Sequence, residues 1–384
     1  MALRYEKGRL IGARKINFHQ ISTAAQWVID QRGEHPMSRF DARQSGYRMP
    51  AEWEPMAATW LGWPVLQDRE ELWGEHYPQV CREFALVAQT IARYQRCIVV
   101  AHAACADAAR EMVGHGVEVL PVAAEDNWVR DCGPIFLQGE RGELAAAVFR
   151  FNSWGGKYHP YDGCQQLGQD IARATGARIF NSHMVLEGGA FYVDGQGTLV
   201  TTESCLLHPN RNPQMSRAEI EAELRRMLGV EKIVWLPGNP DEVETNGHVD
   251  GIASFIAPGK MLCQAASPEQ GDYFRVMQEN RRALALATDA AGRRFELLDL
   301  PSPIVTDRYG SERYCDCYAN YILVNGAVIS TAFGVEQDAA ARAVFERAFP
   351  DRHVELLPVT ALSMGGGSIH CSTQQQPAVM PARA

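Results

Sequence analysis

Val117-Glu-Val-Leu-Pro-Val122 returns far along the chain, almost unchanged, as Val354-Glu-Leu-Leu-Pro-Val359. Weaker copies of the same phrase occupy residues 177–180, 233–237 and 295–301. Each copy is short, rich in aliphatic residues and followed by a turn former, so each predicts a buried strand. The copies begin roughly sixty residues apart, and such even spacing indicates a closed radial array of similar modules.

The segments between these strands repeat as well. Apolar residues at helical spacing predict a helix over residues 78–94, and another over 336–349. A third is predicted over 216–228, because Ser216 and Glu219 form a capping-box pattern. Turn residues between apolar runs predict hairpins, at residues 193–197, 257–260 and 324–327. The predicted unit is therefore a hairpin, a helix and a strand, repeated about five times in an α/β fold.

The composition excludes several classes of protein. The chain has 384 residues, 46% apolar and 22% charged, which is typical of globular proteins. A formal charge of −9 does not favour nucleic acid as a partner. The chain has no apolar run of membrane-spanning length, so we expect no membrane partner. The ten cysteines form no C-x-x-C pair, which argues against a structural zinc site and favours a reduced, cytoplasmic setting.

Residues 1–36 differ in character from the rest. We interpret them as an N-terminal extension that is either disordered or a start-site artefact, because Met37 opens a plausible true start. Residues 37–384 are then expected to form a single α/β domain.

A polar loop follows each recurring strand. These loops occupy residues 125–134, 186–189, 241–251, 306–313 and 364–375. In a radial array such loops converge on one end of the axis, so residues that are distant in sequence would meet there.

Cys371 is the strongest nucleophile these loops offer, because a thiolate reacts well near neutral pH. It follows Gly365, Gly366 and Gly367, which allow the backbone to approach other groups closely. Taken alone, a buried structural cysteine is the commoner interpretation.

Other loops contribute an imidazole and several carboxylates. His248 and Asp250 are two residues apart and could face one pocket, as a general base beside a charged anchor. A metal-binding pair and a plain surface pair are the alternatives. Glu187 precedes two glycines, and Asp131 follows Arg130 and lies near Trp128. For these, an ordinary turn residue, a local Arg–Asp pair and a buried anchor remain alternatives.

Together the loops supply one cysteine, one histidine and at least three carboxylates. Three carboxylates around a thiol would repel an anion and raise the pKa of the thiol. They suit a cation, and a guanidinium pairs bidentately with carboxylates while its charge stabilises a nearby thiolate. The combination therefore points to attack on a guanidino carbon.

Four ordered motifs resemble those of agmatine deiminases, in the peptidyl-arginine deiminase-like family of the guanidine-modifying pentein superfamily. They are residues 128–134 (WVRDCGP), 186–189 (LEGG), 245–250 (TNGHVD) and 365–371 (GGGSIHC). Residues 49–55 (MPAEWEP) are similar to the start of that family, and the resemblance runs from about residue 47 to 377. It implies a five-bladed α/β propeller, the pentein fold. It also implies hydrolysis of agmatine to N-carbamoylputrescine and ammonia, without a metal or cofactor.

The resemblance also implies roles for individual residues. Cys371 matches the nucleophile and His248 the general acid/base. Glu187 matches the carboxylate that handles protons and holds the guanidinium, and Asp131 and Asp250 match those that grip its nitrogens. The other positions that match the substrate pocket are Trp128, Gly366, Gly367 and Glu244, the last of which would meet the far amine of agmatine. A covalent S-alkylthiouronium intermediate on Cys371 would follow.

The chain departs from the family at the pocket rim. Ser368 and Gly251 stand where asparagine is usual, and residues 313–321 differ from the usual fourth loop. Deimination of another guanidine, namely free, modified or peptidyl arginine, therefore remains open, with Arg308 and Arg313 as candidates to bind a carboxylate. A non-catalytic polyamine- or guanidine-binding protein is the remaining alternative. A homodimer or homotetramer is expected by family analogy, and both polyamine synthesis and agmatine catabolism fit.

Overall fold

A computed structural model describes residues 5–6, 9–10, 40–65 and 70–379. The chain divides into two units, Met1–Arg39 and Phe40–Ala384. In the first unit, β1 (Tyr5–Glu6) pairs with β2 (Arg9–Leu10). The rest of the predicted extension over residues 1–36, and the predicted domain start at residue 37, lie outside the described residues. The fold described below is that of the second unit.

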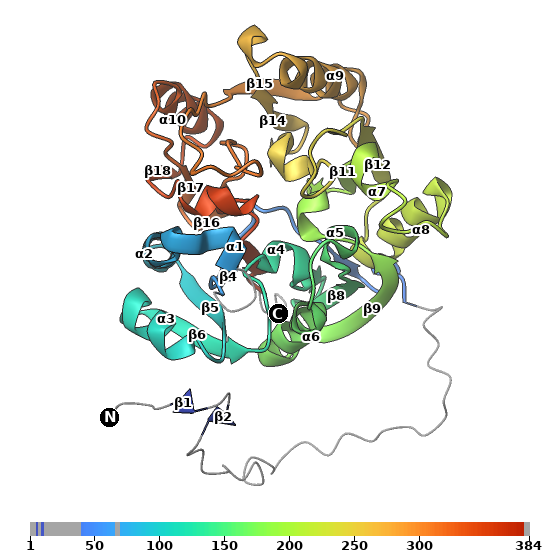
Figure 1. The fold of residues 1–384 in the computed structure, drawn as a ribbon. Coiled ribbons are helices and arrows are strands. Elements are labelled where there is room, and N and C mark those ends of the chain that lie inside the picture. Colours follow the sequence, from blue (N-terminus) through green and yellow to red (C-terminus); the bar gives the residue numbers. More distant parts are fainter. Residues whose placement is uncertain (1–4, 7–8, 11–39, 66–69, 380–384) are drawn as a thin grey trace, which may run out of the picture. The chain divides into compact units, whose positions relative to one another are not determined.

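The second unit has a mixed α/β fold with five small sheets among its described residues (Figure 1). One sheet comprises β3 (Tyr47–Arg48), β7 (Ile135–Gly139), β8 (Leu144–Arg150) and β9 (Arg178–Val185). Three more comprise β10 (Phe191–Val193), β11 (Thr198–Thr202) and β12 (Lys232–Leu236); β13 (Ala253–Ala257), β14 (Lys260–Ala265) and β15 (Glu296–Pro301); and β16 (Ile322–Val324), β17 (Ala327–Thr331) and β18 (His353–Leu357).

Four of these sheets share one module, as the repeated sequence predicts. Two strands form an antiparallel hairpin, a helix follows, and the next strand returns parallel to the second. The helices are α6 (Asp162–Thr175), α8 (Arg217–Leu228), α9 (Asp272–Leu286) and α10 (Gln337–Ala348). The capping box predicted at Ser216 and Glu219 opens α8, with both reciprocal hydrogen bonds present.

The fifth sheet departs from this module. Its strand order is β19 (Thr373–Pro377), β4 (Met56–Gly62), β5 (Arg96–His102) and β6 (Val117–Val122). Its parallel strands are joined through two longer helices, α2 (Tyr77–Ala92) and α3 (Ala106–Val113), with the short α1 (Glu70–Trp73) preceding α2. The hairpin partner of β4 comes from the far end of the chain, since β19 pairs antiparallel with β4.

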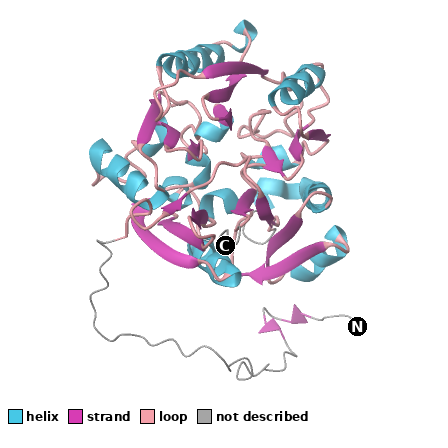
Figure 2. Cartoon of the chain, turned by 180° about the vertical axis from the view of Figure 1, so that it is seen from behind, coloured by secondary structure: helices cyan, strands magenta, loops and turns pink. Residues whose placement is uncertain are grey.

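The longer helices link neighbouring sheets. The helices α6, α8, α9 and α10 each contact the last strand of the preceding sheet, namely β6, β9, β12 and β15. Seen from behind, these helices lie at the periphery of the unit (Figure 2). The remaining helices are short: α1 (Glu70–Trp73), α4 (Val129–Cys132), α5 (Ser153–Gly156) and α7 (Glu203–Leu206), with the 3₁₀ turns η1 (Gly74–His76), η2 (Gly188–Ala190), η3 (Val249–Gly251), η4 (Pro268–Gln270) and η5 (Leu362–Gly365).

The prediction that the recurring strands are buried is wrong for most of their length. Most residues of β6, β15 and β18 are partly or fully exposed, whereas the middle strands β11 and β17 are buried throughout. The reason is their position: each recurring strand is the last in its sheet and has a neighbour on one side only. Within the described part of the chain, no helix combines the length and the apolar character needed to cross a membrane.

Candidate active site

Four of the five polar loops that the sequence predicts to converge meet. Asp131 lies in α4, Glu187 directly precedes η2, and His248 and Asp250 border or occupy η3. Cys371 lies between η5 and β19. Both α4 and η3 contact η2, and α4 contacts β19, so four loops from different sheets surround one point.

Asn320, in the fourth loop, holds the Cys371 loop in place. Its side-chain oxygen accepts hydrogen bonds from the backbone N–H groups of Ser368 and His370 at 3.1 Å each, and from that of Cys371 at 3.3 Å. Its Nδ2 donates to Cys371 Sγ at 3.1 Å. Sequence reasoning missed this residue, because its partners lie about fifty positions away and nothing in its own neighbourhood marks it.

The glycines before Cys371 act as the sequence indicates. A Cβ atom on Gly367 would lie 2.8 Å from Cys371 Cβ and 2.7 Å from the Trp128 ring. Such distances are too short for real carbon atoms, so only glycine lets the loop fold back against Cys371.

The environment of Cys371 is buried and negatively charged. Its Sγ lies 3.5 Å from Asp250 Oδ2. Burial, and then the charges of Asp250 and Asp131, raise the pKa of the Cys371 thiol well above its usual value. Without a cation in the site the sulfur is therefore a neutral thiol at pH 7.

Asp131 is fixed by two donors. Trp154 Nε1 donates to Oδ2 at 2.8 Å, and the backbone N–H of Gly189 donates to Oδ1 at 3.0 Å. A Cβ on Gly189 would lie 2.7 Å from His248 Nδ1, 2.8 Å from Asp250 Oδ2 and 3.0 Å from Asp131 Oδ1. A side chain there would push these three groups apart, which explains the second glycine of the Leu186–Gly189 motif.

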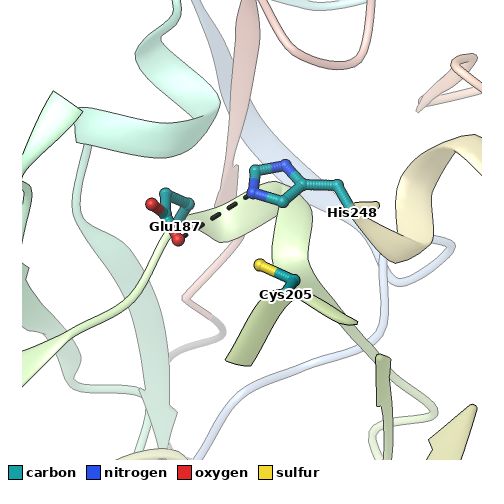
Figure 3. A group of neighbouring side chains, drawn as sticks. All are labelled: Glu187, Cys205 and His248. Carbon is teal, nitrogen blue, oxygen red and sulfur yellow. Dashed lines mark ion pairs between the residues drawn. The ribbon is translucent and has the colours of Figure 1, made fainter. Parts of the chain in front are cut away.

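His248 lies near two carboxylates, those of Glu187 and Asp131, and Figure 3 shows its ion pair with Glu187. Its Nε2 is 3.8 Å from Glu187 Oε2, and its Nδ1 is 3.9 Å from Asp131 Oδ1. These contacts are too long for hydrogen bonds, so neither ring nitrogen has a hydrogen-bond partner among the described residues. Burial opposes a charge on the ring, but the carboxylate of Asp131 and other neighbours outweigh it and raise the pKa of His248.

Glu187 is completely buried and paired with an arginine that sequence reasoning missed. Arg211 Nε donates to Glu187 Oε1 at 2.6 Å, and both side chains are fully buried. Burial raises the pKa of Glu187, but the charge of Arg211 and the contact with His248 lower it to about 2. Glu187 is therefore an anion over the whole neutral range.

Cys205, Glu187 and His248 could in principle hold a metal ion. Each offers one ligand atom, and the three atoms lie within 4.8 Å of one another (Figure 3). Two ligands of a tetrahedral Zn²⁺, bound at about 2.0–2.1 Å, lie roughly 3.3 Å apart. The 3.8 Å between His248 Nε2 and Glu187 Oε2 is longer. An ion would therefore require these side chains to move closer together, and the absence of a metal stays a prediction.

A second histidine, His370, orients Asp250. Its Nδ1 bonds to Asp250 Oδ2 at 2.9 Å. Its Nε2 lies 3.0 Å from both Glu52 Oε1 and the Tyr192 hydroxyl. Glu52 in turn pairs with the buried guanidinium of Arg130. Glu52 belongs to the opening motif of residues 49–55. Its contacts with His370 and Arg130 explain why this motif contains a glutamate at that position.

Two cavities touch Cys371. The smaller holds about 20 Å³, and the larger about 320 Å³. Of the site residues predicted from the sequence, the smaller is lined by Cys371, Trp128, Asp131, Glu244, Gly366 and Gly367. The larger is lined by Cys371, His248, Asp250 and Gly366. Glu187 lines neither cavity.

At the rim of the site, both carboxylate oxygens of Glu244 already have partners. Its Oε2 accepts from the Tyr158 hydroxyl at 2.5 Å, and its Oε1 lies 3.3 Å from Arg313 Nε. Arg308 pairs with Asp316. Both arginines that the sequence offered for binding a carboxylate are therefore neutralised by acidic partners.

The family model for Porphyromonas-type peptidyl-arginine deiminases matches residues 48–377. The chain belongs to this family. The match covers the strands from β4 to β19, the helices between them and all four motifs that carry the resemblance in the sequence.

Relatives in this family agree with that assignment. The chain is 37% identical over 361 residues to the agmatine deiminase of Pseudomonas aeruginosa strain LESB58, covering 88% of this chain and 97% of that one. It is 38% identical to the agmatine deiminase of Stutzerimonas stutzeri strain A1501, with the same coverage. A solved structure of the agmatine deiminase of Enterococcus faecalis is 34% identical, with a TM-score of 0.85 over 89% of this chain and 98% of that one. The protein is thus a guanidine-modifying hydrolase of the agmatine-deiminase type, as its sequence predicts.

Proposed function

We propose that the protein hydrolyses agmatine to N-carbamoylputrescine and ammonia. The observation that carries this proposal is the position of the Cys371 thiol, 3.5 Å from the carboxylate of Asp250 in a cavity that His248 also lines. A thiol, an imidazole and two buried carboxylates are the groups needed to bind a guanidinium and attack its central carbon.

The substrate itself activates the nucleophile in this proposal. Asp131 and Asp250 raise the pKa of the empty site's thiol, since each adds negative charge beside the sulfur. A bound guanidinium pairs with both carboxylates and removes that repulsion, while its own charge favours the thiolate, and the thiol proton is released to solvent. The site therefore becomes reactive when a cation of the right shape is present.

The reaction then proceeds in two stages. The thiolate adds to the guanidino carbon, the C–N bond breaks, and the departing nitrogen takes a proton from His248 and leaves as ammonia. The remaining S-alkylthiouronium is attacked by water, which His248 deprotonates, and the C–S bond breaks to release the ureido product. His248 alternates as acid and base, and its raised pKa supplies the proton for the first stage.

Glu187 acts through His248 in this proposal. It lines neither cavity, and its carboxylate lies 3.8 Å from His248 Nε2. With its pKa held near 2 it stays charged, so it favours the protonated ring and does not carry the proton itself. The resemblance implies that Glu187 holds the guanidinium. In this proposal Glu187 contacts the imidazole of His248 instead.

The choice of agmatine over arginine rests on charge. A substrate carboxylate would need a free cation near the site, but Arg313 pairs with Glu244 and Arg308 with Asp316. Glu244 also lines the smaller cavity, and in this proposal it exchanges its contact with Arg313 for the terminal ammonium of an unbranched chain. Deimination of free or peptidyl arginine is the alternative.

We also propose that the five sheets are the blades of a propeller. In support, four helices each span from their own sheet to the last strand of the preceding one. Pairing of β19 with β4 joins the last part of the chain to the first sheet.

One assay separates the candidate substrates. The purified protein is incubated with agmatine, arginine and an arginyl peptide, and ammonia and ureido product are measured. We expect product from agmatine only. Product from arginine and none from agmatine would overturn the proposed substrate, and no product from any guanidine would favour a binding protein.

Cys371→Ala tests the nucleophile. We expect turnover to disappear, because the covalent bond to the guanidino carbon is made by the Cys371 thiol, which lies 3.5 Å from Asp250 Oδ2. Agmatine should still raise the melting temperature, because Asp131, Asp250 and Glu244 remain. Retained turnover would remove Cys371 from this role.

A further inference from the structure

Arg211 is a buried arginine that contacts three loops around the candidate active site. It lies between α7 and α8, its side chain is fully buried, and it lines neither of the two cavities. Its Nε donates to Glu187 Oε1 at 2.6 Å. Its Nη1 donates to the Trp154 carbonyl and to Asn246 Oδ1 at 2.9 Å each, and its Nη2 donates to the Thr245 carbonyl at 2.9 Å. One guanidinium thus joins three loops that are far apart in the sequence.

Two of the residues that Arg211 holds have a strained backbone. Trp154 has φ 54° and ψ 34°, and Asn246 has φ 64°. This left-handed region is uncommon for residues other than glycine, and it is unfavourable for a side chain as bulky as that of tryptophan. Such conformations persist only where neighbouring groups enforce them. The hydrogen bonds from Arg211 to the Trp154 carbonyl and to the Asn246 side chain are contacts that do so.

Each of these strained segments leads directly to a group of the site. Trp154 Nε1 donates to Asp131 Oδ2 at 2.8 Å. Asn246 stands two residues before His248, and Thr245 Oγ1 accepts the backbone N–H of His248 at 3.1 Å. The contacts of this one guanidinium therefore continue to a carboxylate of the site and to its imidazole.

We propose that Arg211 is a positioning residue for the deimination proposed above, on which this inference rests. Its guanidinium pairs with the buried carboxylate of Glu187 and holds the loops of Asp131 and His248 in their reactive arrangement, without touching the substrate. A lysine would keep the positive charge. As a point charge on a flexible stem, however, it would not reproduce the planar set of donors that joins the three loops. Charge and placement are therefore separable by substitution.

The loss of the charge of Arg211 should change the pH dependence of the reaction. Burial raises the pKa of Glu187, and the charge of Arg211 is the largest contribution that lowers it. Without Arg211 the carboxyl group takes up a proton, so a negative charge 3.8 Å from His248 is lost and the pKa of His248 falls. The other charged or titratable groups that act on Glu187 or His248 all remain, namely Asp131, Asp250, Cys205 and Lys157.

The experiment measures agmatine hydrolysis across a pH series for the full chain and three variants, Arg211→Met, Arg211→Lys and Arg226→Met. We expect Arg211→Met to lower kcat/KM by about 100-fold, the effect of displacing reactive groups by about 1 Å, and to move the alkaline limb of kcat to lower pH. Arg211→Lys should keep the alkaline limb and lose about tenfold in kcat/KM. Arg226 pairs with Glu223 on α8, outside the site, so Arg226→Met is the matched control, with lower stability and unchanged kinetics.

A double variant keeps the test decisive if Arg211→Met does not fold. Arg211→Met leaves the carboxylate of Glu187 buried without its cation, which is strongly destabilising. Arg211→Met combined with Glu187→Gln removes that unpaired charge. We expect calorimetry to show that the double variant binds agmatine about tenfold more weakly than Glu187→Gln alone, because Trp154, which orients Asp131, loses a donor. Equal affinity would limit Arg211 to its pairing with Glu187 and overturn its positioning of the other loops.

The remaining failures are distinct. A kinetic loss in Arg211→Met no greater than in Arg226→Met, with an unmoved alkaline limb, would make Arg211 a purely structural residue and overturn the inference. An unchanged kcat/KM in Arg211→Lys would mean that charge alone suffices, which also overturns the positioning role. Absence of agmatine hydrolysis by the unaltered protein contradicts the proposed function instead.

Discussion

His248 and His370 make an instructive pair. Both are buried, both lie beside two carboxylates, and both have a raised pKa. His370 bonds through both ring nitrogens, to Asp250, Glu52 and Tyr192. His248 has no hydrogen-bond partner among the described residues, and its carboxylates stand 3.8 and 3.9 Å away.

This difference distinguishes the structural role that we propose for His370 from the catalytic role that we propose for His248. A fully bonded buried ring stabilises the fold and cannot turn or exchange its proton without breaking those bonds. A ring held by charge alone, next to the cavity of the nucleophile, remains available to a departing nitrogen or to water. Removing His248 should therefore affect activity, and removing His370 should affect stability.

The largest effect is expected from His248→Gln. We expect kcat to fall by about 10²–10⁴-fold, the usual contribution of general acid–base catalysis. The melting temperature should fall less than in a His370 variant, because no hydrogen bond among the described residues is lost and only the charge that offsets Asp131 is removed. Steady-state kinetics and thermal unfolding measure the two effects.

The same variant can reveal the intermediate. If activation of water is slowed more than departure of ammonia, intact-protein mass spectrometry after acid quench should detect an adduct of agmatine minus ammonia on Cys371. Wild-type-like turnover in His248→Gln would contradict the catalytic role of His248 and so the distinction between the two histidines.

A smaller loss of activity but a larger loss of stability is expected from His370→Gln. Breaking a buried ion pair by removing one partner costs about 3–5 kcal/mol, since the other charge stays buried. Asp250 also loses its orienting contact, so we expect about a tenfold decrease in kcat/KM. Urea unfolding measures the first effect.

The stability difference should depend on pH. Burial and Arg130 lower the pKa of His370, but Glu52 and Asp250 outweigh them and leave it raised. Its stabilisation is then fully present below the unfolded value of about 6.5 and is lost as the pH rises through the higher folded value. The pKa values of Asp250 and Glu52 are lowered, so their share is lost as the pH falls below about 4. The variant should therefore differ most between these limits, and a difference independent of pH would contradict the ion pairing.

The smallest effect is expected from Cys205→Ala. Cys205 is fully buried in α7 and helps to raise the pKa of His248. Without it that pKa falls, so His248 loses its proton at a lower pH, and the alkaline limb of kcat should move to lower pH with a change of only a few-fold at pH 7. Cys263→Ala, at a buried position in β14, is the matched control. Identical pH profiles for both variants would mean that Cys205 has no electrostatic role.

Local patterns predicted much of this molecule. The hairpins, the helices and the recurring strands depend on neighbouring residues, as the capping box at Ser216 illustrates. The convergence of Asp131, His248, Asp250 and Cys371 followed from the repeat and from the resemblance. The partners that tune these groups could not be predicted, because the contacts of Arg211 with Glu187, and of Glu52 with His370, join residues whose own surroundings carry no signal.

Because tertiary contacts are not visible in the sequence, the different surroundings of the two histidines could not be predicted. In the sequence, His248 and His370 both stand close to a proposed site residue, and only tertiary contacts reveal which ring is bonded on both sides. Exposure of the recurring strands was missed for a related reason, since apolar content does not tell an edge strand from a central one.

The pairing of β4 with β19 has a consequence for folding during synthesis of the protein. The side chains of Trp60 and Gln376, which bond across these strands, are 316 positions apart. During translation β4 leaves the ribosome long before β19 has been synthesised. The edge of the sheet at β4 therefore stays unpaired until nearly the whole chain has been made. Cys371 stands two residues before the start of β19, so its position is set by the same late pairing. If Cys371 is the nucleophile, as proposed above, a newly made chain is inactive until nearly all of it has been synthesised.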